Sequence, residues 1–150
     1  MRVIREGLDE AALGELAAEV ARRLRPGDVV VLAGEVGSGK STFVRAAARA
    51  LGVKERVTSP TYQLARAYEG SAGGRRVAVN HLDLYRVEEI GDWDALSLED
   101  YLAPDAVTFI EWADPALGIL ENPTVIRLEH ESPRTRRVRI EGPVAERMGC

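Results

Sequence analysis

The sequence predicts an α/β fold with a mixed, mostly parallel sheet that also contains antiparallel hairpins. Three observations lead to this prediction. The five apolar residues Val29–Ala33 are typical of a strand buried on both faces, as in a parallel sheet. A glycine-rich turn follows this run and leads into apolar residues at helical spacing. Two further pairs of strand-like segments, each joined by a turn, predict the hairpins.

Length and composition fit one domain that covers residues 1–150. The chain is 45% hydrophobic, which is enough for a core, and its formal net charge of -4 argues against a protein that holds nucleic acid by itself. Cys150 is the only cysteine, so an internal disulfide is excluded. The charged opening MRVIREGLDE lacks the apolar core of a signal peptide, and no apolar run approaches the length of a membrane span. We therefore expect a cytoplasmic protein that does not enter the membrane.

The first predicted helix begins after Asp9, whose side chain suits a helix N-cap. Apolar residues then recur at helical spacing and arginines fill the last turn: Leu13, Leu16, Val20 and Leu24, with Arg22, Arg23 and Arg25. The second predicted helix runs from Lys40 to Leu51, with one apolar stripe formed by Phe43, Val44, Ala47 and Leu51. Gly52 is a typical C-terminal stop.

The second half of the chain is expected to hold a loop, two hairpins, a buried strand and further helix. Pro60 favours a loop over Val57–Thr61. The other expected elements are a hairpin of Tyr62–Tyr68 and Arg76–Leu84 around the turn GSAGG, one or two helices within Glu88–Leu102, a strand Ala106–Ile110, and a closing hairpin of Thr124–Glu129 and Arg136–Glu141. The tail after about residue 141 is expected to be flexible.

The glycine-rich turn matches a phosphate-binding pattern. Gly34 and the run Gly39-Lys40-Ser41 fit G-x-x-x-x-G-K-[ST]. The glycines let main-chain N–H groups converge on phosphate oxygens, and the following helix adds the positive end of its dipole. Lys40 can neutralise the β- and γ-phosphates, and the Ser41 hydroxyl suits Mg²⁺. The strand–turn–helix context therefore predicts a nucleoside triphosphate site in a three-layer sandwich of the P-loop NTPase type.

Two carboxylates are candidates for the chemistry that such a site needs. Phosphoryl transfer requires a carboxylate near the metal and a group that places water or an acceptor. Glu111 directly follows a buried strand, and ligands in such sheets bind beyond the carboxyl ends of the strands. Asp83, in a predicted hairpin strand, is the second candidate. The spacing of Asn80 and Asp83 imitates a guanine-reading motif, but His81 replaces its lysine, so adenine is favoured.

Four segments together resemble the TsaE (YjeE) family of small bacterial P-loop ATPases. They are GEVGSGKSTFVRAAARALGV, VTSPTYQLARAYEG, VNHLDLYRVEE and FIEWAD, in an order that covers roughly residues 8–120. Members of this family are required for the threonylcarbamoyl modification of adenosine 37 in tRNAs that read ANN codons. The resemblance implies a Mg²⁺-dependent ATPase that is slow alone, acts with a TsaB–TsaD complex, and meets tRNA only through that complex.

The resemblance also implies roles for individual residues. ATP would be held by the Walker A loop, which consists of Gly34, Glu35, Val36, Gly37, Ser38, Gly39, Lys40, Ser41 and Thr42. Ser41 and Glu111 would hold Mg²⁺, and Asp83 would orient or deprotonate water, or hold a metal-bound water. Thr61 would sense the γ-phosphate. Asp9 matches a position near the base, although it also suits a plain helix cap.

Smaller features and rival functions stay open at this point. His81 either orients Asp83 or the water, or is structural. The basic stretch in the closing hairpin is typical of a solvated face, with tRNA contact as the alternative: Arg134, Arg136, Arg137 and Arg139. One rival function is a small-molecule kinase, for which 150 residues leave little room for an acceptor pocket and lid. The other is a nucleotide-dependent switch without useful hydrolysis, in which VTSPT orders around the γ-phosphate and recruits a partner.

Overall fold

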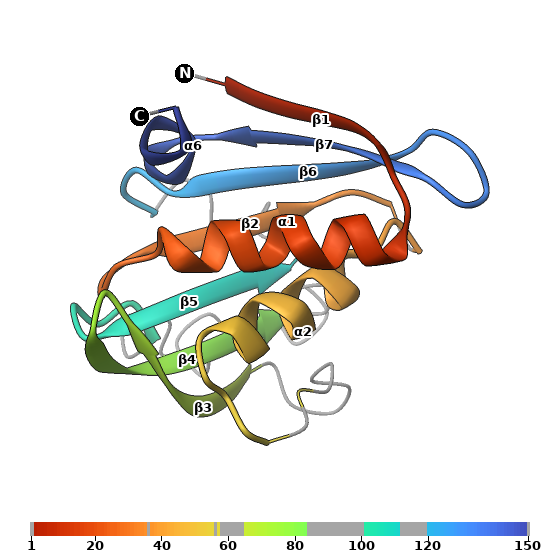
Figure 1. The fold of residues 1–150 in the computed structure, drawn as a ribbon. Coiled ribbons are helices and arrows are strands. Elements are labelled where there is room, and N and C mark those ends of the chain that lie inside the picture. Colours follow the sequence, from red (N-terminus) through yellow and green to blue (C-terminus); the bar gives the residue numbers. More distant parts are fainter. Residues whose placement is uncertain are drawn as a thin grey trace, which may run out of the picture.

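The computed structural model describes residues 2–35, 37–55, 57, 65–83, 101–111 and 120–149. The elements in chain order are β1 (Arg2–Leu8), α1 (Glu10–Arg22), β2 (Val29–Ala33), α2 (Lys40–Ala50), β3 (Ala65–Ala72), β4 (Arg75–Asp83), β5 (Ala106–Glu111), β6 (Thr124–His130), β7 (Arg136–Glu141) and α6 (Pro143–Met148). The seven strands of the described chain form one sheet in the order β1-β7-β6-β2-β5-β4-β3 (Figure 1).

The sheet is parallel at its centre and antiparallel towards both edges. β5 pairs in parallel with β2 and β4, and β2 also pairs in parallel with β6. The outer pairs β3–β4, β6–β7 and β1–β7 are antiparallel. The predicted α/β class, with a mixed sheet and two hairpins, is therefore confirmed, and parallel and antiparallel pairs are equal in number.

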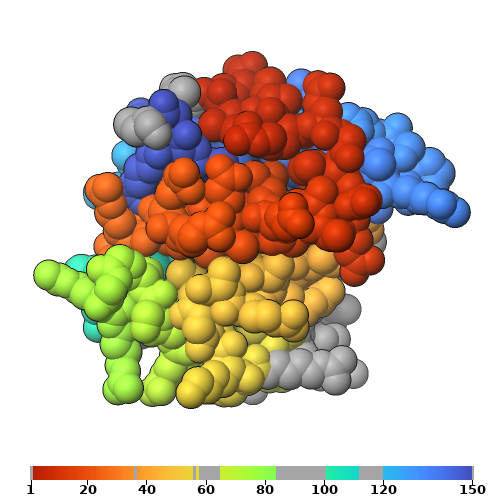
Figure 2. All heavy atoms as spheres, in the orientation of Figure 1, coloured from red at the N-terminus to blue at the C-terminus, as the bar shows by residue number. Residues whose placement is uncertain are grey.

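Helices α1 and α2 pack side by side on one face of the sheet (Figure 1). The side chain of Asp9 caps α1 by accepting a hydrogen bond from the Ala12 N–H at 2.8 Å, and the predicted apolar stripe of this helix is buried. Figure 2 shows the atoms of the two helices covering the middle of this face. The main core lies beneath them, and a smaller cluster around Val31, Leu82 and Ile110 lies on the opposite face, because alternate residues of a strand point to opposite sides.

The hairpin of β3 and β4 has a tighter turn than the sequence predicts. Ala72 pairs with Arg75, so the loop is only Gly73 and Gly74, whose φ angles of 59° and 78° suit a two-residue turn. The earlier part of the GSAGG segment belongs to β3. Gly70 is needed there because a Cβ atom would lie 2.7 Å from the Leu51 carbonyl oxygen.

Two elements at the chain ends were not predicted. β1 is an edge strand that pairs with β7. The tail, expected to be flexible, contains α6, in which Val144 and Ala145 are fully buried. Arg147 anchors this helix, since its guanidinium contacts the Asp28 carboxylate at 2.6 Å and donates to the Arg23 carbonyl oxygen at 2.8 Å.

Several predictions fall outside the described residues. These are the loop Val57–Thr61 apart from Val57, the start of the strand Tyr62–Tyr68, and the helical region Glu88–Leu102 apart from its last two residues. Within the described residues, helices are too short and too polar to cross a membrane.

Candidate functional site

The glycine loop connects β2 to α2 in a conformation that only glycine tolerates at its first position. Gly34 has a φ angle of 148°, and a Cβ atom there would lie 2.5 Å from the Leu128 carbonyl oxygen and 2.7 Å from Ser38 Oγ. Gly39, with a φ angle of 103°, is the N-cap of α2 and provides no side-chain cap. The loop therefore packs tightly against β6 at Gly34. No capping side chain covers the N-terminus of α2.

Lys40 is a buried cation at the start of α2. Only 6% of the residue is exposed, and its ammonium donates a hydrogen bond to the Gly34 carbonyl oxygen at 2.6 Å, across the loop. Burial lowers the pKa of Lys40 from its ordinary value of 10.5, while the carboxylates of Glu111 and Asp83 act in the opposite direction. The loop thus carries a positive charge that is poorly solvated and that an anion would stabilise.

The parallel sheet brings the two predicted carboxylates together. Asp83 and Glu111 are register partners at the carboxyl ends of β4 and β5, and Leu32 of β2 is the partner of Glu111 on its other side. The Ser41 hydroxyl lies 3.4 Å and 3.5 Å from the two carboxylate oxygens of Glu111. A cavity of about 310 Å³ is lined by Asp83 and Glu111 together with residues of the glycine loop and the start of α2, namely Gly37, Gly39, Lys40, Ser41 and Thr42.

His81 contacts Glu111. Its Nε2 atom lies 2.5 Å from Glu111 Oε2, and both side chains are almost fully buried. Glu111 lines the cavity and His81 does not, so His81 contacts this carboxylate from outside the cavity. Of the alternatives left open by the sequence, the structure favours a supporting role, directed at Glu111.

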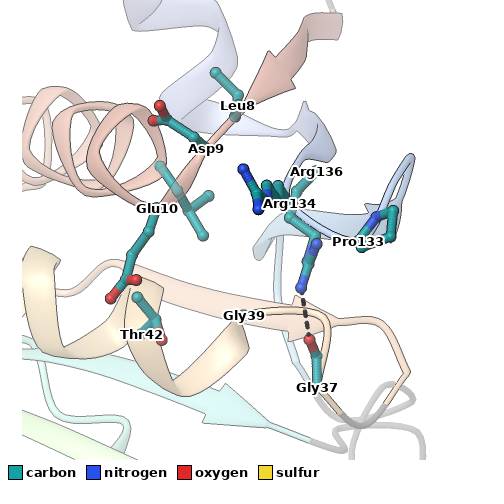
Figure 3. A pocket seen from close by; sticks show the side chains of 10 residues that line it. Leu8, Asp9, Glu10, Gly37, Gly39, Thr42, Pro133, Arg134 and Arg136 are labelled. Carbon is teal, nitrogen blue, oxygen red and sulfur yellow. Dashed lines mark hydrogen bonds between the residues drawn. The ribbon is translucent and has the colours of Figure 1, made fainter.

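A second cavity, of about 480 Å³, lies beside the glycine loop. Its lining comes from the β1–α1 junction, the loop and the β6–β7 turn: Leu8, Asp9, Glu10, Leu13, Gly37, Gly39, Thr42, Pro133, Arg134 and Arg136 (Figure 3). Asp9 therefore serves as the helix cap, as predicted, and also lines this cavity. The two cavities share Gly37, Gly39 and Thr42, so they form adjacent parts of one recess.

Arg136 contacts the glycine loop, which the sequence interpretation did not anticipate. Its Nη2 donates to the Gly37 carbonyl oxygen at 3.2 Å (Figure 3), and its Nε donates to the Ser38 carbonyl oxygen at 3.2 Å. Its neighbour Arg137 instead pairs with Glu6 and Glu129. A basic hairpin gives no signal in the sequence that one arginine of four reaches a loop 98 residues away.

Two predicted nucleotide-binding residues, Val36 and Thr61, lie outside the described residues. The other predicted members of the site are placed. Gly34 and Ser38 belong to the loop but do not line the cavity of about 310 Å³. Within the loop, the carbonyl oxygen of Glu35 accepts a hydrogen bond from the Ser38 N–H at 3.0 Å. The loop is thus held by its own backbone as well as by Lys40 and Arg136.

Comparisons with known proteins identify the family and the fold that this chain resembles. The family model for threonylcarbamoyl adenosine biosynthesis protein TsaE matches residues 8–138. The tRNA threonylcarbamoyladenosine biosynthesis protein TsaE of Treponema pallidum is 34% identical over 123 residues, which are 82% of this chain and 85% of the relative. The protein of the same name from Streptomyces coelicolor is 37% identical over 115 residues, or 76% of this chain and 74% of the relative. A crystal structure of Bacillus subtilis YdiB superposes with a TM-score of 0.76 at 23% identity, covering 98% of this chain and 88% of that chain.

Proposed function

The chain belongs to the TsaE family of tRNA threonylcarbamoyladenosine biosynthesis proteins, and from this premise we propose that it is a Mg²⁺-dependent ATPase of that pathway. One observation carries the proposal. Lys40, Ser41, Asp83 and Glu111 come from three separate segments of the chain and line a single cavity beside the glycine loop. A cation, a hydroxyl and two carboxylates in one recess are the groups that phosphoryl chemistry requires.

The residues at the cavity fit a nucleotide phosphate chain. The buried ammonium of Lys40 donates to a neutral carbonyl oxygen, that of Gly34, and would gain charged partners in the β- and γ-phosphates. The start of α2 adds N–H groups and the positive end of the helix dipole. Because a side chain at Gly34 would collide with the Leu128 carbonyl, the glycine lets the start of the loop pack closely against β6.

Ser41 and Glu111 are the groups that would hold Mg²⁺. Their oxygens lie within 3.5 Å of each other, and hard oxygen donors are the ligands that Mg²⁺ prefers. His81 fixes one oxygen of Glu111, so this carboxylate is held in place before any ion arrives. When bound, the metal neutralises charge on the phosphate chain.

Asp83 is assigned to the attacking water. It lines the same cavity as Lys40 and is the register partner of Glu111 on the neighbouring strand. A carboxylate at this position can accept a hydrogen bond from water and so orient its lone pair towards the terminal phosphate. Since phosphoryl transfer passes through a loose transition state, positioning of this kind contributes more than removal of the proton.

The cavity bounded by Asp9 and the β6–β7 turn is proposed to take the base and ribose. It adjoins the phosphate cavity through Gly37, Gly39 and Thr42, and its volume of about 480 Å³ suits a nucleoside. Adenine remains the proposed base, because the guanine-reading spacing around Asn80 is incomplete.

We further propose that the ATPase acts on tRNA modification through a TsaB–TsaD complex and does not hold tRNA itself. The net charge of -4 supports an indirect role, because direct binding would rely on clustered basic side chains. Three of the four arginines of the closing hairpin, Arg136, Arg137 and Arg139, are also engaged within the chain.

The test is ATP hydrolysis by the purified chain, alone and with TsaB, TsaD and tRNA. We expect slow turnover by the chain alone and a rise when the partners are added, with no turnover by Lys40→Ala in either mixture. Transfer of phosphate to a small molecule instead of water would favour a kinase. ATP binding with no turnover in either mixture would favour a nucleotide-dependent switch.

A further inference from the structure

The β6–β7 turn, residues Glu131–Thr135, lies beside the glycine loop although nearly one hundred residues separate them in the chain. Figure 2 shows this hairpin projecting at one side of the molecule. The turn is held firmly on its other side, since the Glu131 carboxylate accepts a hydrogen bond from the Gly7 N–H at 2.9 Å. Ser132 and Thr135 close it internally through their hydroxyls, 2.7 Å apart. These hydrogen bonds fix the conformation of the turn, so the turn can position the glycine loop that lies beside it.

Arg136 links this turn to the glycine loop. Its Nη1 donates to the carbonyl oxygens of Ser132 at 3.2 Å and Thr135 at 3.0 Å. Its Nε and Nη2 donate to two consecutive carbonyls of the loop, those of Ser38 and Gly37. Four of the donors of the planar guanidinium are thus used, and a lysine could not reproduce this geometry because its ammonium is a single point of charge.

We propose that Arg136 is a positioning residue for phosphate binding, which acts by fixing the orientation of the loop peptides. The peptides are trans, so each N–H points opposite to the carbonyl of the same peptide group. A bond to the Ser38 carbonyl therefore fixes the direction of the Gly39 N–H, which lies on the side away from the guanidinium. Gly39 lines the phosphate cavity. The inference rests on the proposed phosphate-binding function of that cavity.

The charge of Arg136 acts in the same sense as its geometry. A cation on the Ser38 carbonyl draws electron density through that peptide group and makes the Gly39 N–H a better donor to an anion. The bond to the Gly37 carbonyl supports the loop instead, because the N–H of that peptide group already donates to the Glu35 carbonyl oxygen. Arg136 lines the adjoining cavity but not the phosphate cavity, so its effect on the phosphate passes through the loop peptide that it contacts.

The test uses inorganic tripolyphosphate and ATP as ligands, measured by isothermal titration. Tripolyphosphate has no base or ribose, so it reports on the loop alone. We expect Arg136→Lys and Arg136→Gln to weaken tripolyphosphate binding on the order of tenfold, which corresponds to about one hydrogen bond to a charged group. ATP binding should weaken by at least the same factor, because Arg136 also lines the adjoining cavity. The matched controls Arg137→Lys and Arg137→Gln alter the next residue of the strand, which pairs with Glu6 and Glu129, and should bind both ligands as the unaltered chain does.

Other outcomes separate the alternatives. Unchanged tripolyphosphate affinity in both Arg136 variants overturns the proposal, and a loss confined to ATP would place Arg136 at the base instead. A second contrary result is an Arg136 variant that melts at a lower temperature yet binds both ligands with unchanged affinity where it is folded. That result would give Arg136 a structural role only and would also overturn the proposal. Failure of the unaltered chain to bind either ligand would instead overturn the phosphate-binding function on which the inference rests.

Discussion

At the residue scale, Asp83 and Lys40 share a cavity but have separable tasks. Asp83→Asn keeps the size of the side chain and removes its charge, so ATP should still bind through the loop while turnover falls by about two to four orders of magnitude. Single-turnover hydrolysis and equilibrium ATP binding measure the two effects. Asp105→Asn, an exposed carboxylate just before β5, is the control and should change neither. Normal hydrolysis by the Asp83 variant in the full complex would remove this residue from the mechanism.

The lowered pKa of Lys40 predicts a proton uptake on binding. In the free protein burial favours the neutral amine, so Lys40 begins to lose its proton below the ordinary value of 10.5. A phosphate chain favours the ammonium and raises the pKa again. Tripolyphosphate affinity should therefore fall as pH rises through the lowered pKa, and binding in that alkaline range should take up protons.

Calorimetry without metal, in two buffers of different ionisation enthalpy, measures this uptake. At pH values well below the lowered pKa little uptake is expected, because Lys40 is then charged in both the free and the bound protein. If the tripolyphosphate affinity stays constant and no protons are taken up as the pH rises to the ordinary lysine pKa, the bound anion does not change the pKa of Lys40.

At the scale of elements, α6 is expected to contribute to stability. Val144 is fully buried between this helix and the sheet, so Val144→Ala should lower the free energy of unfolding by about 2 kcal/mol through lost contacts and a cavity. Ile4→Ala in β1 is the comparison, because Ile4 is 39% exposed, and its cost should stay under about 1 kcal/mol. Urea unfolding of the two variants measures both. Equal, small costs would mean that the tail is dispensable.

Elements with local signals were predicted well, and elements that depend on distant partners were not. β2 and α2 follow from an apolar run, a glycine pattern and a helical stripe, all within Val29–Ala50. β1 carries three charged residues among seven and forms because β7 offers it an edge. α6 follows Gly142, where a Cβ atom would meet the Pro123 carbonyl oxygen at 2.7 Å, a contact that no local pattern contains.

The same distinction holds for the site. The sequence named Asp83 and Glu111 as separate candidates, and their pairing follows from the parallel alignment of β4 with β5, which the predicted hairpin did not specify. The bonds from Arg136 to the loop and from His81 to Glu111 depend on side-chain directions fixed only by the packed fold. Patterns in the sequence therefore indicated residues that the structure brings to one cavity, and missed the side chains of Arg136 and His81 as supports of that cavity.

At the scale of the whole molecule, the recess joins parts of the chain that are far apart in sequence. It is bounded by the β1–α1 junction, the glycine loop, the ends of β4 and β5, and the β6–β7 turn. A ligand that contacts all of these binds the folded state only, so it stabilises the fold by an amount set by its concentration relative to its Kd. Saturation with Mg·ATP at one hundred times Kd should stabilise the protein by about 2.7 kcal/mol.

For a domain of this length that stabilisation corresponds to a rise in melting temperature of roughly 5–10 °C. The Lys40→Ala variant should melt near the temperature of the unaltered free protein, because loss of the ammonium also removes the cost of burying its charge. Added ATP should not raise the melting temperature of this variant, because the variant no longer binds the nucleotide. Differential scanning fluorimetry with ATP, with ADP and with adenosine resolves which part of the nucleotide is responsible. A rise with adenosine equal to that with ATP would place the binding energy in the base cavity, and the phosphate loop would then contribute little to holding the molecule together.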